Sequence, residues 1–250
     1  MSKFVVITGS CGGIGRALVE TYLKANYSVI GLDRLALGTN SNDNFIEINP
    51  DLEEFSKNKR YREKILDQIK SLLPNDLEEF ILINNAAEQI LKNIDDMNWQ
   101  DWQSSFAVNT TAPFFLVQGL IEELKKTRGH IINISSIHSK QTKANFSCYA
   151  ASKAALEALT RSLALELSIK GVSVNAIAPA AIATQMLKDG FAEAPEKLKE
   201  LESYHPAGII GSPEQLAIFV KSVTEQRGGF LTGSVLEFNG GIAGKLSDPA

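Results

Sequence analysis

The 250-residue sequence is poor in the features that mark secreted, membrane-spanning or nucleic-acid-binding proteins. Its two cysteines, Cys11 and Cys148, are too few for a disulfide framework, and we expect both to be reduced. Basic residues number 25 against 29 acidic ones, and the net charge of −4 argues against a nucleic-acid partner. No apolar run approaches the length of a membrane span, and the N-terminal run is too short for a signal peptide. We therefore expect a cytoplasmic protein without a membrane partner.

The length and the 44% hydrophobic content suit one domain, residues 1–250, with a substantial core. Apolar runs predict strands at residues 3–7, 27–32, 45–48, 80–83, 130–135, 172–177 and 235–238. Helical patterns span residues 54–73, 99–126 with a bend at Pro113, 147–169, an irregular excursion at 184–204, and a stretch from Ser212. This alternation predicts a doubly wound, Rossmann-type α/β domain with seven parallel strands, helices on both faces, and a ligand crevice at the carboxyl ends of the strands.

A glycine-rich loop, residues 8–15, stands between the first strand and the following helical pattern. Glycines at positions 9, 13 and 15 allow a tight turn, a close approach of backbone N–H groups to a pyrophosphate, and packing of helix against strand. The N-terminus of the helix favours the negative charge of the phosphates. A glycine loop alone is weak support for a nucleotide site, but the next strand strengthens it.

That second strand ends at Asp33, eighteen residues beyond Gly15. A carboxylate at this place accepts hydrogen bonds from an adenosine ribose and repels a 2′-phosphate, so NAD is favoured over NADP. Two alternatives to this interpretation of the Asp33 carboxylate stay open. Asp33 could be a solvated turn residue, and Arg34 directly after it could tolerate a phosphate.

Tyr149 and Lys153 lie four residues apart on a predicted alanine-rich helix, thirteen residues after Ser136. A tyrosine hydroxyl has an ordinary pKa near 10, so it accepts protons at neutral pH only when a positive charge stabilises its ionised form. Lys153 is placed to supply that charge. The pair alone is more typical of an ordinary helix surface. Its combination with the glycine loop and Asp33 favours an acid/base site.

Taken in order along the chain, these motifs resemble the short-chain dehydrogenase/reductase family from Lys3 to about Gly241. The family's Asn-Asn-Ala-Gly segment falls on residues 84–87, and its segment after the sixth strand on Pro179 and Ala180. The resemblance implies four catalytic residues, Asn109, Ser136, Tyr149 and Lys153. It implies cofactor contacts from Gly9, Cys11, Gly13, Ile14, Gly15, Asp33, Asp51, Leu52, Asn85, Ala86, Ala87, Tyr149, Lys153, Pro179, Ile182 and Thr184. It implies no metal site.

The family resemblance also implies the reaction, a hydride transfer between NAD, or less favourably NADP, and a secondary alcohol or ketone. Tyr149 is the expected acid/base, with a pKa lowered by Lys153 and by the oxidised nicotinamide. Lys153 would also hold the nicotinamide ribose, and Ser136 would hydrogen-bond the substrate oxygen. Asn109 would bend its helix and hold a water, and Thr184 would bind the carboxamide. Ala87 and Ala180 replace usual glycines, which matters if either backbone needs a positive φ.

The substrate is expected to be a small molecule, and polar residues beside the pocket hint at a sugar-like compound or a hydroxy acid. These residues are Glu88, Gln89, Gln141 and Asn145. His138 is either a substrate contact or a partly exposed loop residue. Residues 184–207 resemble a substrate lid, although Met186, Leu187 and Phe191 also suit simple packing.

Family members commonly assemble through the alanine-rich helix, which implies a homotetramer or a dimer, although a monomer's core would also accept these alanines. Two other functions stay open. A sugar-nucleotide epimerase or dehydratase shares the Tyr-x-x-x-Lys motif but usually has a longer C-terminal region. A non-catalytic dinucleotide-binding regulator would be expected to lose Ser136, Tyr149 or Lys153, and all three are present.

Overall fold

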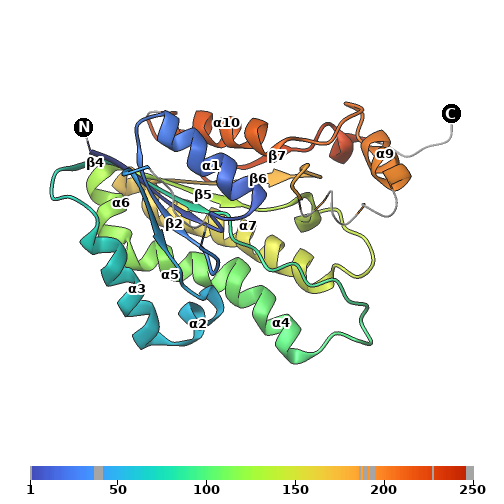
Figure 1. The fold of residues 1–250 in the computed structure, drawn as a ribbon, viewed down its shortest axis with the longest axis horizontal. Helices are drawn as coiled ribbons and strands as arrows, with labels where there is room; N and C mark the ends of the chain where they lie inside the picture. Colours follow the sequence, from blue (N-terminus) through green and yellow to red (C-terminus); the bar gives the residue numbers. More distant parts are fainter. Residues whose placement is uncertain are drawn as a thin grey trace.

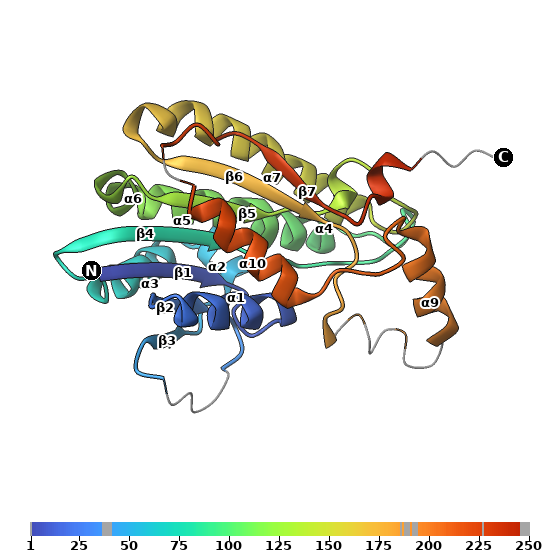
Figure 2. The same ribbon diagram turned by 90° about the horizontal axis from the view of Figure 1, so that it is seen from above.

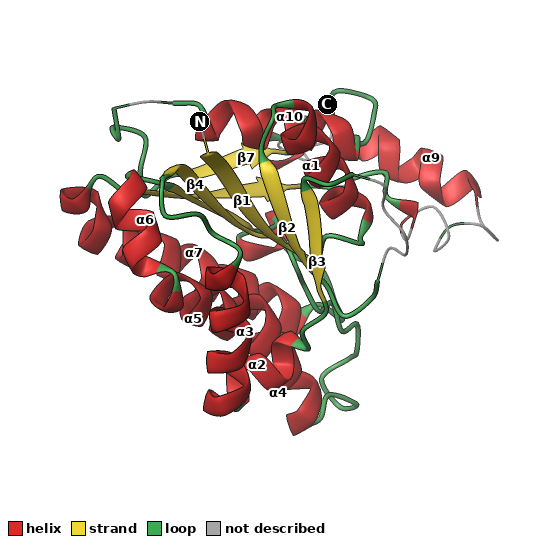
Figure 3. Ribbon diagram, turned by 60° about the vertical axis from the view of Figure 1, so that its left-hand side comes forward, coloured by secondary structure: helices red, strands yellow, loops and turns green. Residues whose placement is uncertain are grey.

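The structure, a computed structural model, describes residues 2–36, 42–185, 187, 191, 195–226 and 228–245. Seven parallel strands form one sheet in the order β3-β2-β1-β4-β5-β6-β7, which confirms the predicted doubly wound α/β class (Figures 1 and 3). The strands are β1 (Ser2–Thr8), β2 (Ser28–Leu32), β3 (Phe45–Ile48), β4 (Leu77–Asn84), β5 (His130–Ile134), β6 (Ser173–Pro179) and β7 (Val235–Phe238).

The described helices are α1 (Gly13–Lys24), α2 (Leu52–Lys57), α3 (Lys59–Ser71), α4 (Trp99–Phe106), α5 (Ala112–Gly119), α6 (Ile121–Thr127), α7 (Ser147–Leu167), α9 (Pro195–Tyr204) and α10 (Pro213–Thr224). Helices α1 and α10 lie side by side on one face of the sheet, and α2 to α7 lie on the other (Figures 1 and 2). Alternate residues of β1 serve the two faces: Val6 packs in one buried cluster, and Val5 and Ile7 pack in the other. The apolar runs of the strands are continuous, rather than alternating, because helices cover both faces of the sheet. None of the helices described here is long and apolar enough to cross a membrane.

The predicted helix at residues 54–73 is wrong as a single element. The chain forms α2 and α3, and Asn58 between them has an extended backbone. The side chain of Asn58 accepts a hydrogen bond from the Tyr61 N–H at 3.2 Å and so caps α3. Asparagine competes for backbone groups in this way, which favours a helix start over a helix interior.

The predicted helix at residues 99–126 is also divided, and its bend does not lie at Pro113. Between α4 and α5 the chain makes a π-helical turn, η1 (Ala107–Thr111), and a second break falls at Leu120. Pro113 lies in the first turn of α5, where a missing N–H costs nothing. Turns of this π-helical kind are a common cause of helix bends, and this one contains Asn109.

Strands β1 and β4 are neighbours although β2 and β3 follow β1 along the chain. The connections therefore leave β1 and β4 toward opposite sides, which opens a crevice at their carboxyl ends. Helix α9 lies beyond the same ends of the strands (Figure 2). Part of the predicted lid lies outside the described residues, namely residues 186, 188–190 and 192–194.

Candidate active site

The glycine loop packs tightly on the start of α1. Gly9 has φ +67°, and a Cβ on Gly15 would lie 1.9 Å from the Gly9 carbonyl oxygen, so both positions require glycine. No side chain caps α1 at Gly12. Helix N-termini carry unsatisfied N–H groups and partial positive charge, so this end of α1 suits a phosphate.

Two predicted cofactor segments that are far apart in the sequence meet at Gly13. A Cβ on Gly13 would lie 2.9 Å from the side chain of Thr184, so the loop after β1 touches the segment after β6. That segment is anchored by Ile182, which forms a bridge with Gly211. Pro179 ends β6 directly before it, and Ile14 occupies the first turn of α1.

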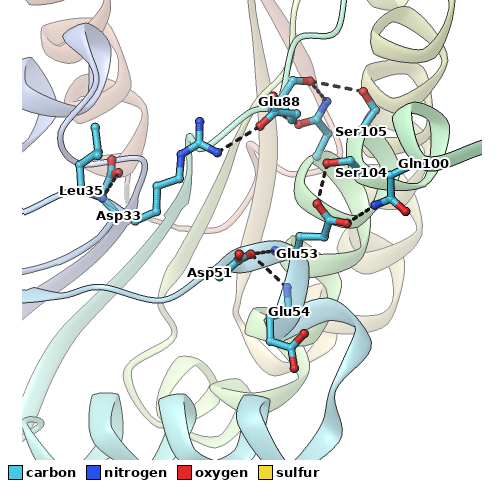
Figure 4. A network of polar contacts seen from close by, with 11 residues as sticks. Asp33, Leu35, Asp51, Glu53, Glu54, Glu88, Gln100, Ser104 and Ser105 are labelled. Carbon is cyan, nitrogen blue, oxygen red and sulfur yellow. Dashed lines mark hydrogen bonds and ion pairs between the residues drawn. The ribbon is translucent and has the colours of Figure 1, made fainter. Parts of the chain in front are cut away.

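The Asp33 carboxylate uses both oxygens to hold backbone at the end of β2. One oxygen accepts from the Cys11 N–H at 2.9 Å. The other oxygen accepts from the Leu35 N–H at 3.0 Å (Figure 4). The Cys11 thiol donates to the Leu35 carbonyl oxygen at 3.1 Å. Burial, followed by the charges of Asp33 and Glu47, raises the pKa of Cys11 to about 11. Cys11 is therefore a neutral thiol at neutral pH.

A cavity of about 270 Å³ lies beside Asp33 at the carboxyl ends of the strands. It is lined by Gly9, Leu32, Asp33, Arg34, Pro50, Asp51, Leu52, Glu53, Ala86, Ala87, Glu88, Ser104 and Val108. Asp51 caps α2 through one oxygen, which accepts from the Glu53 N–H at 2.8 Å and the Glu54 N–H at 3.1 Å. This cavity, Asp33 and the uncapped start of α1 fit the adenosine and diphosphate of a dinucleotide.

The loop after β4 is tied to the glycine loop. The Thr8 hydroxyl accepts from the N–H groups of Asn85 and Ala86, both at 2.9 Å, and the Asn85 amide donates to the carbonyl oxygens of Thr8 and Gly9. The Asn85 side chain thus holds the backbone at the start of the glycine loop. Neither Ala87 nor Ala180 has a positive φ, so their methyl groups cause no backbone strain.

Tyr149, Lys153 and Ser136 come together where β5 meets α7. Lys153 is 1% exposed, and its ammonium donates to the Ile134 carbonyl oxygen at 2.7 Å and lies 5.8 Å from the centroid of the Tyr149 ring. Burial lowers the pKa of Lys153 to about 7. It also raises the pKa of Tyr149, and the hydrogen bond from Ser136 is the opposing influence. The predicted lowering of the Tyr149 pKa is not found in the protein alone, because burial outweighs that bond.

Asn109 is fully buried in the π-helical turn and joins two parts of the site. Its Oδ1 accepts from the Glu88 N–H at 2.7 Å, and its Nδ2 donates to the Glu88 carbonyl oxygen and to the Ser152 hydroxyl, both at 2.9 Å. The Ser152 hydroxyl donates in turn to the Tyr149 carbonyl oxygen at 2.8 Å. Asn109 therefore connects the loop after β4 with the helix of the predicted acid/base.

Glu157 was not among the residues predicted from the sequence, and it is buried next to the loop that carries Ser135 and Ser139. Its carboxylate accepts from the Ser135 hydroxyl at 2.9 Å and also from the Ser139 hydroxyl. Ser135 thus faces away from Tyr149. The available signal was spacing, since Glu157 follows Tyr149 and Lys153 at successive intervals of four and lies on the same side of α7.

His138 stacks on Phe146, with ring centroids 4.2 Å apart, and its Nδ1 lies 3.1 Å from the Thr142 hydroxyl. Burial lowers the pKa of His138 to about 4, so its ring is neutral at neutral pH. A second cavity of about 220 Å³ lies beyond it, and Gln141 lines it and donates to the Ala243 carbonyl oxygen. The other lining residues are Ile137, Ser139, Lys140, Ala178, Glu237, Asn239 and Ala243.

The fold and the site define a dinucleotide-binding protein of the doubly wound class. The family described as short chain dehydrogenase matches residues 3–195, and the chain belongs to this family. A 3-oxoacyl-[acyl-carrier-protein] reductase of Aquifex aeolicus (strain VF5) is 33% identical over 96% of this chain and 97% of its own length.

Two solved structures are also similar to the chain. The ligand-free aldohexose dehydrogenase of Thermoplasma acidophilum has a TM-score of 0.88 at 25% identity, with 100% of this chain and 97% of that chain covered. ElxO with NADP bound has a TM-score of 0.84 at 25% identity, with 98% and 100% covered. The protein is therefore an oxidoreductase that uses a nicotinamide cofactor to interconvert alcohols and carbonyl compounds.

Proposed function

We propose that the protein oxidises a polar secondary alcohol, or reduces the matching ketone, with NAD(H) as cofactor and Tyr149 as the proton carrier. The observation that carries the proposal is the meeting of Ser136, Tyr149 and Lys153 at the carboxyl end of β5. Tyr149 is 9% exposed, and the centroid of its ring lies 5.8 Å from the Lys153 ammonium. When bound, the nicotinamide supplies the hydride acceptor or donor.

Each of the three residues has a separate task. Tyr149 removes the hydroxyl proton of the alcohol or returns it to the ketone oxygen. Ser136 donates a hydrogen bond to the same substrate oxygen and stabilises the charge that develops there. Lys153 supports the ionised tyrosine electrostatically and hydrogen-bonds a cofactor ribose. Asn109 positions the group through Ser152 and Glu88.

The preference for NAD rests on Asp33. Its carboxylate faces the cavity at the end of β2 and is held there by two backbone N–H groups. A ribose 2′-hydroxyl can donate to such a carboxylate, whereas a 2′-phosphate is repelled by it. The relative ElxO binds NADP, so the preference is a property proposed for this chain's own residues.

The polar substrate is proposed from the second cavity. Five of its eight lining residues are polar or charged, and the ion pair of Lys140 with Glu237, at 3.1 Å, lies among them. We further propose that residues 184–207 close over the substrate. The chain is proposed to act as one domain, residues 1–250, in a cytoplasmic homotetramer or dimer.

The test is a substrate panel followed by a tyrosine substitution. Sugars, hydroxy acids and cyclic alcohols are offered with NAD and with NADP, and the absorbance of reduced cofactor is followed. On the best substrate Tyr149→Phe should lower kcat by about 10²–10⁴, while the dissociation constant for NADH, measured by fluorescence, stays within a few-fold. Tyr27→Phe is the control. Tyr27 directly precedes β2, and its hydroxyl donates a hydrogen bond to Glu79 rather than to any residue of the predicted site. Full turnover by Tyr149→Phe would refute the assignment.

A further inference from the structure

An ion pair connects the two sides of the adenosine cavity. Arg34 follows β2 and Glu88 follows β4, and the Arg34 Nη1 lies 3.8 Å from the Glu88 carboxylate (Figure 4). Both residues line the cavity. The Arg34 side chain is 75% exposed, and that of Glu88 is 32% exposed. The guanidinium is thus directed away from Asp33, its neighbour in the sequence, and toward the opposite side of the cavity.

The backbone of Glu88 is the fixed part of this pair. Its N–H and its carbonyl oxygen are both bonded to the buried Asn109, at 2.7 and 2.9 Å. Arginine has a long side chain with many rotamers, and its guanidinium settles where a fixed anion attracts it. The position of the guanidinium therefore depends on Glu88.

The charged residues that line the cavity are mostly acidic, so the one cation among them, Arg34, bears on how a 2′-phosphate would bind there. The lining residues include four carboxylates, those of Asp33, Asp51, Glu53 and Glu88, and one cation, that of Arg34. Glu53 is already engaged by Lys57, Ser104 and Gln100. Arginine is the residue best suited to bind a phosphate through paired N–H groups. Among the lining residues, only Arg34 could therefore neutralise a 2′-phosphate beside Asp33.

We propose that Glu88 is a specificity-determining residue. By pairing with Arg34 it withholds the guanidinium from a 2′-phosphate, and it thereby reinforces the preference for a cofactor with a free 2′-hydroxyl. This inference rests on the proposed binding of NAD at Asp33. Because exposed ion pairs are weak, releasing Arg34 should change the affinity for a 2′-phosphate by about two- to fivefold rather than by orders of magnitude.

The test uses two probes that differ only by the 2′-phosphate, 5′-AMP and 2′,5′-ADP. Their dissociation constants are measured by calorimetry for the full chain and for Glu88→Gln, Arg34→Gln and the double variant. Glu88→Gln should bind 2′,5′-ADP about two- to fivefold more tightly, and its affinity for 5′-AMP should be unchanged. The gain should vanish in the double variant, because it depends on the released guanidinium. Glu63→Gln, which removes the exposed partner of Lys59 outside the cavity lining, is the control for the change in net charge.

The outcomes separate this inference from the proposed function. If Glu88→Gln binds both probes as the unaltered protein does, the role of Glu88 is refuted. If the gain persists in the double variant, Glu88 acts only by its own repulsion, and the pairing with Arg34 is refuted. If the unaltered protein binds 2′,5′-ADP more tightly than 5′-AMP, the proposed NAD preference fails on its own, since that comparison involves no variant.

Discussion

Asn109 and Glu88 hold each other by two hydrogen bonds. The Asn109 Oδ1 accepts from the Glu88 N–H at 2.7 Å, and the Asn109 Nδ2 donates to the Glu88 carbonyl oxygen at 2.9 Å. The same amide nitrogen reaches Ser152 on the helix of Tyr149. The partly buried backbone of Glu88, which lies outside any helix or strand, is satisfied in this way by one side chain. Asn109 thereby fixes the place of Glu88 relative to Tyr149.

Asn109→Ala should therefore destabilise the protein more than Ser152→Ala does. The first substitution removes the partner of the Glu88 N–H and leaves the Glu88 carbonyl oxygen with only the Ser105 hydroxyl, 3.5 Å away, so we expect a loss of about 1–3 kcal/mol. The second removes one hydroxyl, and we expect a loss of about 1 kcal/mol. Urea denaturation at equilibrium measures both free energies of unfolding. An Asn109→Ala variant as stable as Ser152→Ala would contradict the bridging role.

Ser136 should set the pH at which the alcohol is oxidised. Its hydrogen bond is the influence that lowers the pKa of Tyr149 against burial. Oxidation needs the ionised tyrosine, so kcat/KM should rise with pH, and in Ser136→Ala the midpoint of that rise should lie at higher pH. Reduction needs the protonated tyrosine, so its kcat/KM should fall with pH and its midpoint should move in the same direction.

Ser135→Ala provides the comparison for that pH profile. The Ser135 hydroxyl bonds Glu157 at 2.9 Å, so its removal should leave the midpoint in place. Equal shifts in the two variants would mean that the pH dependence belongs to another group.

Lys153 should make the protein more stable at alkaline pH. Its pKa is about 7 in the folded protein, below the ordinary value of 10.5. Between these pH values the unfolded chain binds more protons than the folded one, so the free energy of unfolding rises with pH, by at most about 1.4 kcal/mol per pH unit. Lys153→Met should flatten this rise between pH 7 and 10 in denaturation series. Lys64 is exposed, so Lys64→Met should not change the rise of stability with pH. An unchanged slope in Lys153→Met would contradict the burial of the ammonium.

Gly15→Ala should damage the fold before any cofactor binds. Its Cβ would lie 1.9 Å from the Gly9 carbonyl oxygen, and backbone must move to relieve that overlap. We expect a loss of about 2–4 kcal/mol in the free energy of unfolding. Gly12→Ala is the matched variant, because its Cβ would lie 3.5 Å from the same oxygen, an ordinary contact. Its loss should stay below about 1 kcal/mol. Equal losses would show that the tight packing of this loop is not what requires glycine.

Much of the fold follows from local patterns. Apolar runs such as Val5–Ile7, each followed by turn residues and a helical pattern, predict strands that are buried on both faces. The order of the glycine loop, Asp33 and the pair of Tyr149 with Lys153 predicts the class of protein. Each of these signals is contained within a few residues of the sequence, so it can be recognised without knowledge of distant contacts.

Two helix predictions failed for a related reason. The break at Asn58 and the π-helical turn around Asn109 both depend on an asparagine side chain that finds backbone partners. A hydrophobic period continues across such residues, so it does not reveal the break. For Asn109 the partner is Glu88, which is 21 residues earlier in the chain.

The remaining features arise only when strands distant in sequence become neighbours. The ion pair of Arg34 with Glu88, the contact of Gly13 with Thr184, and the bond from Lys153 to the Ile134 carbonyl oxygen all join separate elements at one edge of the sheet. The pKa directions of Tyr149 and Lys153 have the same origin, because burial is a property of the packed molecule. Residue types and spacing thus specify which chemical groups are available, and the packing of parallel strands settles which of them meet and how strongly each is desolvated.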